Sequence, residues 1–130
     1  MNEHQIELID INIESKDIFM NFDTATHLGL ILNELIINSF KYAFPDGSGT
    51  ISIRFQQIDD RFTLIVEDDG TGFPVKEILA TDTLGLKLVN ELVEQIQGEI
   101  HIDGSSGSKY TINFRNLVPS KKDLSFENKL

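Results

Sequence analysis

Residues 32–43 read Leu-Asn-Glu-Leu-Ile-Ile-Asn-Ser-Phe-Lys-Tyr-Ala, and this stretch decides how the rest of the chain can be organised. Helical residues advance by about 100° each, so Glu34, Asn38, Lys41 and Tyr42 fall on one narrow stripe. Apolar residues flank this stripe, whereas an ordinary solvated helix face is wide and charged throughout. The opposite side, which we expect to pack on a sheet, carries Leu28, Leu32, Leu35, Ile36, Ser39, Phe40 and Ala43.

The other elements follow from apolar periodicity and from turn residues. Asp23 and Thr24 are suitable N-cap residues for the helix above, and Gly98 is a suitable stop for a second one. Strands are predicted at residues 5–14, 17–22, 50–57, 62–67, 99–103 and 109–115, and helices at residues 24–44 and 84–97. Hairpins dominate this order, which predicts an α/β fold: a two-layer α/β sandwich with a mixed sheet covered on one face by helices. We expect one domain over residues 1–116 and a flexible tail over 117–130.

Composition excludes several classes of protein. The 130 residues carry a net charge of −10, which disfavours nucleic acid as a partner because a phosphate backbone needs clustered Lys and Arg. There are no cysteines, so a disulfide framework and a thiolate metal site are excluded. The sequence has no run of 18 or more apolar residues and does not start like a signal peptide. We therefore expect a cytoplasmic domain without membrane contact.

The polar stripe of the first helix has two interpretations. In the structural one, it is a surface stripe on which Glu34 and Lys41 attract each other across two turns. In the functional one, Asn38 offers an oxygen to a hard cation, Glu34 orients a water or acts as a base, and Lys41 meets phosphate. His27 lies near the same stripe, and we interpret it as incidental because nothing nearby pairs with it.

Two glycine-containing segments could shape a ligand site. Asp68 closes an apolar strand and is followed by Gly70 and Gly72, so its carboxylate could accept a hydrogen bond from an amino group such as that of adenine. The alternative is a plain turn. Gly85, in the first turn of the second helix, costs about 1 kcal/mol relative to Ala. Either tight packing requires it, or the free N–H groups of this helix start bind an anion with help from Lys87.

Taken in order, these segments resemble the catalytic ATP-binding domain of the GHKL superfamily, in particular that of histidine kinases. Residues 32–43 are similar to the N box, residues 66–74 to the G1 box, residues 83–89 to the G2 box, and residues 107–114 to the closing strand motif. The likeness covers residues 6–115, and the ordered set is far more specific than any one box. It implies the Bergerat-type ATP-binding fold, and the few residues between Pro74 and Gly85 resemble a short-lid subclass.

The resemblance implies a role for each site residue. Asn38 would bind Mg2+, with Glu34 nearby as the base or water-holder. Asp68 would read the adenine amine with support from Thr111. The remaining residues would surround the nucleotide. Lys41 would contact a phosphate, and Tyr42 would pack beside the nucleotide. Gly70 and Gly72 would shape the pocket, and the phosphates would meet the backbone of Gly85, Leu86 and Lys87.

The resemblance also implies a partner. None of His4, His27 and His101 lies in a helical hairpin, so the accepting histidine would come from a separate dimerisation domain of the parent kinase, with a response regulator acting downstream. Two alternatives are an anti-sigma-type serine kinase and a non-catalytic interaction module that keeps the fold. The chain has Asp82-Thr83 where the G2 box usually begins with another glycine. We therefore expect weak ATP binding by an isolated, monomeric domain.

Overall fold

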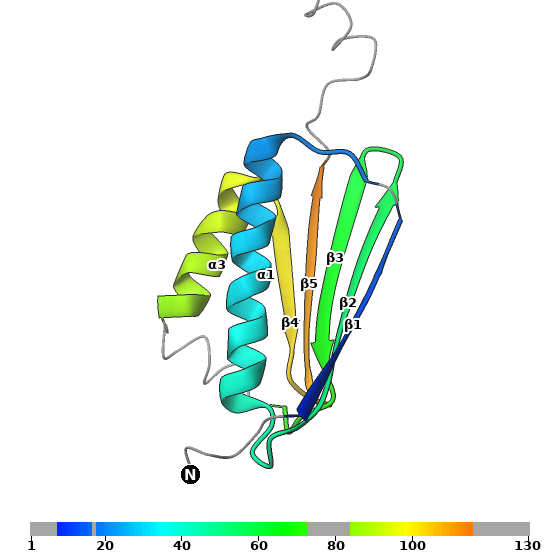
Figure 1. The fold of residues 1–130 in the computed structure, drawn as a ribbon. Helices are drawn as coiled ribbons and strands as arrows, with labels where there is room; N and C mark the ends of the chain where they lie inside the picture. Colours follow the sequence, from blue (N-terminus) through cyan, green and yellow to red (C-terminus); the bar gives the residue numbers. More distant parts are fainter. Residues whose placement is uncertain (1–7, 17, 73–83, 116–130) are drawn as a thin grey trace, which may run out of the picture.

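A computed structural model of the chain describes residues 8–16, 18–72 and 84–115, and it contains one sheet with two helices on one of its faces (Figure 1). The strands are β1 (Leu8–Ser15), β2 (Ser48–Ile58), β3 (Arg61–Asp68), β4 (Glu99–Asp103) and β5 (Ser108–Arg115), and the helices are α1 (Phe22–Tyr42) and α3 (Leu84–Gln95). The strand order is β1-β2-β3-β5-β4, and β1 is parallel to β2 while the other pairs are antiparallel. The predicted two-layer α/β sandwich is confirmed.

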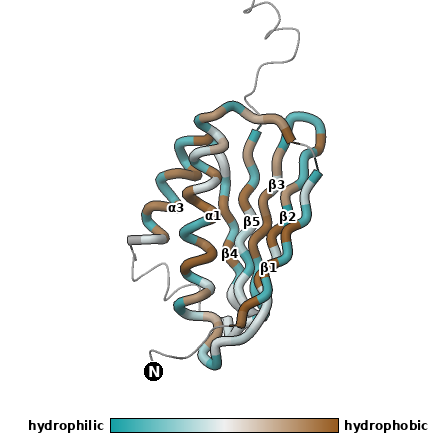
Figure 2. Tube along the Cα trace, in the orientation of Figure 1, coloured by the Kyte–Doolittle hydropathy of each residue, from teal (hydrophilic) through white to brown (hydrophobic). Residues whose placement is uncertain are grey.

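The core lies between the helices and the sheet. Every second residue of β3 and β5 is buried. Figure 2 shows hydrophobic residues along the helices and along the strands that they cover. Three rings from neighbouring strands pack together, with Phe62 stacked on Phe114 at 5.0 Å between centroids and Phe55 edge-on to Phe62 at 5.6 Å. The intervening residues of these strands face away from the helices, so one face of the sheet is free of helices among the described residues.

The start of α1 differs from our prediction. The N-cap is Asn21, whose side chain accepts a hydrogen bond from Thr24 N at 2.8 Å, and not Asp23 or Thr24. Asp23 lies instead in the first turn, where a carboxylate is favoured by the helix dipole. Residues 18–21 form no strand, because Ile18 and Met20 pack against the core without a ladder partner. The predicted strand at residues 17–22 is therefore wrong.

The end of α3 also differs in detail. The helix ends at Gln95, before the predicted end at Gln97, and Gln97 adopts the left-handed conformation with φ 57°. Gln97 N donates to Glu94 O and Gly98 N donates to Val93 O, both at 2.9 Å, which is the hydrogen-bond pattern of a Schellman motif. Gly98 is still required, since an added Cβ would lie 2.9 Å from the Asn113 carbonyl oxygen.

The two helices run antiparallel, and His27 connects them near the start of α1. Its Nδ1 lies 2.6 Å from Asp23 O, and its Nε2 lies 2.7 Å from Gln95 Oε1 on α3. The expectation that nothing pairs with His27 was wrong. The bond to the Asp23 carbonyl and then the one to Gln95 raise the pKa of His27 above 6.5. Because the folded state holds the proton more tightly, this stabilisation is complete below pH 6.5 and is lost as the pH rises through the raised pKa.

Some predictions fall outside the described residues. These are the short lid within residues 75–83, the first residues of the strand predicted at 5–14, and the tail at 117–130. Within the described part of the chain, no helix is long and apolar enough to cross a membrane.

Candidate functional site

The polar stripe of α1 faces the first turn of α3. If Gly85 carried a Cβ, that atom would lie 3.0 Å from Glu34 Oε2 and 3.7 Å from Asn38 Oδ1. A Cβ would be in tight contact with Glu34 and in ordinary contact with Asn38, which favours a glycine at this position. The stripe is thus not a plain solvated face: Glu34 and Asn38 are partly buried and point toward a helix start.

This arrangement suits a cation and an anion together. Amide and carboxylate oxygens are ligands that Mg2+ prefers, and a helix start offers free N–H groups to an anion. The first turn of α3 contains no acidic residue that would oppose an anion there. Among the described residues, no group of three or more His, Cys, Asp or Glu is arranged to hold a metal ion.

Asp68, the second predicted centre, is buried at the end of β3 with 6% of its surface exposed. Its Oδ1 accepts hydrogen bonds from Gly70 N at 3.0 Å and Ser108 N at 3.1 Å. Its Oδ2 accepts from Ser39 Oγ at 2.8 Å and from Ser108 Oγ. A carboxylate has about four lone-pair positions, so protein donors already fill its accepting capacity.

Ser108, and not Thr111, supports Asp68. Residues of β5 alternate between the two faces of the sheet, with Ser108 and Tyr110 buried on the helix side. Thr111 pairs with Ile65, and its side chain lies on the other face of the sheet. Ser108 pairs directly with Asp68 in the register of β3 and β5. The predicted support by Thr111 is therefore wrong. The period-2 alternation of the apolar residues Tyr110, Ile112 and Phe114 along β5 would have pointed to Ser108.

Tyr110 joins the two centres. Only 3% of its surface is exposed, and its side chain is hydrogen-bonded to Asn38. Burial raises the pKa of Tyr110 to about 12, the negative charge of Asp68 adds to this increase, and the Asn38 hydrogen bond opposes it. Sequence reasoning missed Tyr110, Ser39 and Ser108. The only signal for Ser39 was a hydroxyl on the apolar side of a helix.

Glycines let the loop after β3 pass close to other segments. A Cβ on Gly70 would lie 2.3 Å from Ala43 O, the carbonyl that accepts a hydrogen bond from Thr71 N. Gly72 has φ 73°, and a Cβ there would lie 2.4 Å from Gly104 O in the β4–β5 turn. The loop is thereby held between the end of α1 and the β4–β5 turn, and a role of the two glycines in shaping a nucleotide pocket stays a prediction.

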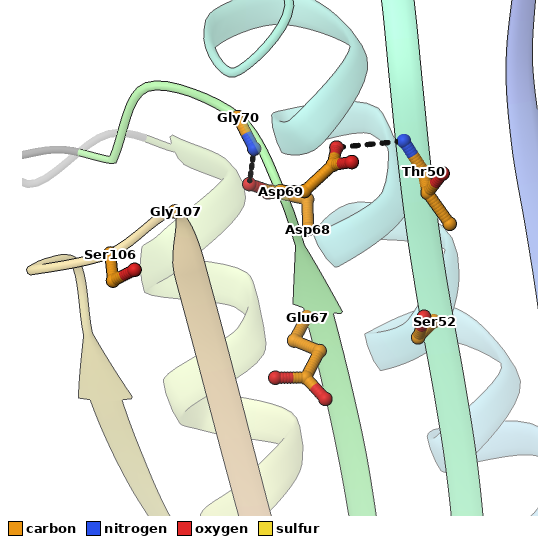
Figure 3. A pocket seen from close by; sticks show the side chains of 8 residues that line it. All are labelled: Thr50, Ser52, Glu67, Asp68, Asp69, Gly70, Ser106 and Gly107. Carbon is orange, nitrogen blue, oxygen red and sulfur yellow. Dashed lines mark hydrogen bonds between the residues drawn. The ribbon is translucent and has the colours of Figure 1, made fainter.

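A polar hollow of about 530 Å³ lies beside this loop (Figure 3). Figure 3 shows Gly70 N bonded to Asp68, and Asp69 accepting from Thr50 N at 2.8 Å. Ser52 and Glu67, which also line it, alternate with core residues, so the hollow opens away from the helices. The carboxylates of Glu67 and Asp69 disfavour a triphosphate here. The helix side of the sheet is the better candidate for an anion.

The structure shows where the other predicted site residues lie, but it does not test the roles predicted for them. Lys41 and Tyr42 lie in the last turn of α1, and Tyr42 is 59% exposed. Lys87 is exposed on α3, whereas the Leu86 side chain is buried in the core. The Leu86 side chain is therefore not exposed to a ligand, and the roles of Lys41, Tyr42 and Lys87 stay predictions.

Comparison with known sequences identifies the family. Residues 23–118 match the family described as histidine kinase-, DNA gyrase B-, and HSP90-like ATPase, which is well over half of the 130 residues. The chain belongs to this family. Its members share the GHKL fold that the four motif segments resembled, and the segments at residues 32–43 and 66–72 contain Asn38 and Asp68, the two centres described above.

Individual relatives are histidine kinases. The chain is 28% identical over 109 residues to blue-light-activated histidine kinase 2 of Erythrobacter litoralis, covering 81% of this chain and 32% of the relative. It is 26% identical over 138 residues to sensor histidine kinase WalK of Bacillus subtilis, covering 93% of this chain and 22% of the relative. The chain therefore spans about a third or less of the length of these curated relatives.

Solved structures agree with the sequence comparison. The histidine kinase domain of the Erythrobacter litoralis EL346 blue-light-activated histidine kinase superposes with a TM-score of 0.74 at 27% identity, over 82% of this chain and 54% of that one. A second structure of the EL346 kinase gives a TM-score of 0.76 at 26% identity, over 83% of this chain and 35% of that one. The fold is that of the ATPase domain of histidine kinases.

Proposed function

We propose that this chain is the ATP-binding catalytic domain of a sensor histidine kinase, acting in the cytoplasm. It would transfer the γ-phosphoryl group of ATP to a histidine on a separate dimerisation segment, from which a response regulator would receive it. Family membership and the histidine kinase relatives support this proposal. The observation that carries it is the approach of Gly85 at the start of α3 to Glu34 and Asn38 on α1.

The phosphate half of the site would lie at this approach. The N–H groups at the start of α3 would meet the phosphates, with Lys41 and Lys87 within the same region of the two helices. Asn38 would bind Mg2+ and Glu34 would hold a water or act as base. The metal would neutralise phosphate charge, which matters because the chain carries a net charge of −10.

The adenine half would lie at Asp68, with Tyr42 beside the nucleotide. The carboxylate already accepts four hydrogen bonds, so an adenine amine must take the place of one donor. The hydroxyls of Ser39 and Ser108 are the donors that can rotate away, whereas the backbone N–H groups are fixed. This competition supports the expectation that the isolated domain binds ATP weakly.

Phosphoryl transfer to another segment is consistent with the chain's own histidines. Both ring nitrogens of His27 are bonded within the chain, and His101 lies on β4 at the helix-free face of the sheet. In the transfer, the bond from the γ-phosphorus to the bridging oxygen of ADP would break and a bond to an imidazole nitrogen would form. Positioning and charge neutralisation would provide most of the catalysis.

Replacing Asn38 tests the assignment. We expect Asn38→Ala to lose most Mg-ATP binding, measured by titration of a fluorescent ATP analogue. Asn33→Ala is the matched control, because Asn33 is an exposed amide on another side of the same helix. Undiminished binding by the Asn38 variant would refute the site. The relatives do not favour a serine kinase or a non-catalytic module, and phosphorylation of a serine on a partner protein would be the result that revives the former.

A further inference from the structure

We propose that Tyr110 is a positioning residue for Asn38, holding the side-chain amide so that its oxygen is directed to the phosphate half of the site. This inference rests on the proposed function, since it concerns how the metal-binding amide is oriented. Tyr110 is not itself expected to touch nucleotide or metal.

The first argument is the hydroxyl itself. Tyr110 is one of the buried residues of β5, and the next two on the same face, Ile112 and Phe114, are wholly apolar. A phenylalanine would fill the same space without burying a hydroxyl, and burying one is costly unless it is hydrogen-bonded. The hydrogen bond with Asn38 satisfies this hydroxyl and connects β5 to α1.

The second argument is the direction of the amide. Asn38 Oδ1 lies 3.7 Å from the position that a Cβ of Gly85 would occupy, so the oxygen is turned toward the start of α3. The amide has a donor end and an acceptor end. A contact with Tyr110 at the donor end leaves the oxygen for a hard cation. Without Tyr110, the amide is free to rotate and to present its NH2 group instead.

The third argument is the neighbouring residue. Ser39 follows Asn38 and donates to Asp68 Oδ2 at 2.8 Å, so two consecutive residues of α1 are bonded to the sheet. Tyr110 is also close enough to Asp68 for that carboxylate to affect its pKa. The same turn of α1 is therefore fixed through two different strands, β3 and β5.

The test separates orientation from general stability. We expect Tyr110→Phe to raise the Mg2+ concentration needed for half-maximal binding of a fluorescent ATP analogue by about fivefold, as loss of one hydrogen bond would. Binding of the same analogue in the presence of a chelator should change less than about twofold. In an Asn38→Ala background, the Tyr110 change should have no further effect.

Ile112→Val is the matched control, because Ile112 is fully buried in the same strand and does not contact the polar cluster through a hydrogen bond. It should lower the melting temperature and leave the Mg2+ dependence unchanged. In the nucleotide-free chain, the side-chain amide signals of Asn38 in a 1H–15N NMR spectrum should move in Tyr110→Phe and stay in place in Ile112→Val.

Each outcome has a distinct meaning. Equal weakening with and without Mg2+, or unmoved Asn38 signals, would overturn the role of Tyr110. If Asn38→Ala impairs Mg-ATP binding and Tyr110→Phe does not, only this inference fails. If Asn38→Ala leaves binding undiminished, the proposed function fails first.

Discussion

Replacement of Asp68 should show how a buried carboxylate holds the end of β3. Asp68→Ala removes the acceptor of four hydrogen bonds, two of them from the backbone N–H groups of Gly70 and Ser108. A buried N–H without a partner costs about 1–3 kcal/mol. The serine hydroxyls can rotate, and water can reach the partly buried Gly70. We therefore expect a loss of about 3 kcal/mol in the free energy of unfolding.

Asp68→Asn should cost much less. The asparagine keeps one oxygen for both backbone N–H groups and places an NH2 group where Oδ2 was. The hydroxyls of Ser39 and Ser108 can turn and accept from this group, and the site no longer buries a charge. We expect a loss of about 1 kcal/mol or less.

Urea denaturation followed by circular dichroism would compare these variants, with Asp69→Asn as control. Asp69 is the adjacent, exposed carboxylate and accepts one bond, from Thr50 N at 2.8 Å. Its replacement should change stability by no more than about 0.5 kcal/mol. Equal losses in Asp68→Asn and Asp68→Ala would refute the reasoning, because they would assign the stabilisation to charge and not to hydrogen-bond acceptance.

Three other predictions concern packing and pH. Gly107→Ala should lower the melting temperature sharply, because Gly107 has φ 73° and an added Cβ would lie 2.1 Å from Asp68 O. Differential scanning fluorimetry would measure the melting temperature, and an unchanged value would contradict the turn geometry. Phe62→Ala should cost about 3–5 kcal/mol in urea denaturation, because the fully buried ring stacks on another ring at 5.0 Å, and a loss near 1 kcal/mol would show that the core collapses into the space. His27→Gln should destabilise the chain more at pH 5.5 than at pH 8.5, since the raised pKa places the stabilising form at low pH. Thermal melts at the two pH values would measure this, and equal losses would refute a role for the protonated ring.

The sequence indicated the two centres of the candidate site where residue chemistry and position in the element agree. Asn38 and Glu34 lie on a narrow stripe between apolar residues, and Asp68 ends a strand of apolar residues, so both centres could be predicted from spacing. Gly85 could be recognised from the sequence as a residue that lowers helix stability and therefore needs a structural or functional reason. The reason is that Glu34 and Asn38 lie close to this position. That closeness depends on how α1 and α3 pack, and neither segment's sequence shows it.

The errors have local physical causes. Asn21 caps α1 because its side chain reaches Thr24 N, and Asp23 and Thr24 are equally suitable caps by residue type. The support by Thr111 was implied by the resemblance, and Ser108 also carries a hydroxyl in the same strand. The alternation of β5 puts Ser108 on the helix side and Thr111 on the other, and the register of β3 and β5 places Ser108 opposite Asp68. Register depends on side chains from several strands, so one strand's sequence does not determine it.

The two halves of the candidate site act as one unit because of consecutive residues on α1. Asn38 and Ser39 point about 100° apart, so one reaches the start of α3 and the other reaches Asp68. A shift of this turn would change the proposed cation ligand and the proposed adenine acceptor together. Under the proposed function, an adenine amine would also displace a hydroxyl from Asp68, at a cost of about 1 kcal/mol for one hydrogen bond. That cost corresponds to about a fivefold loss of affinity, and it exists before any contribution from the segment between Pro74 and Gly85.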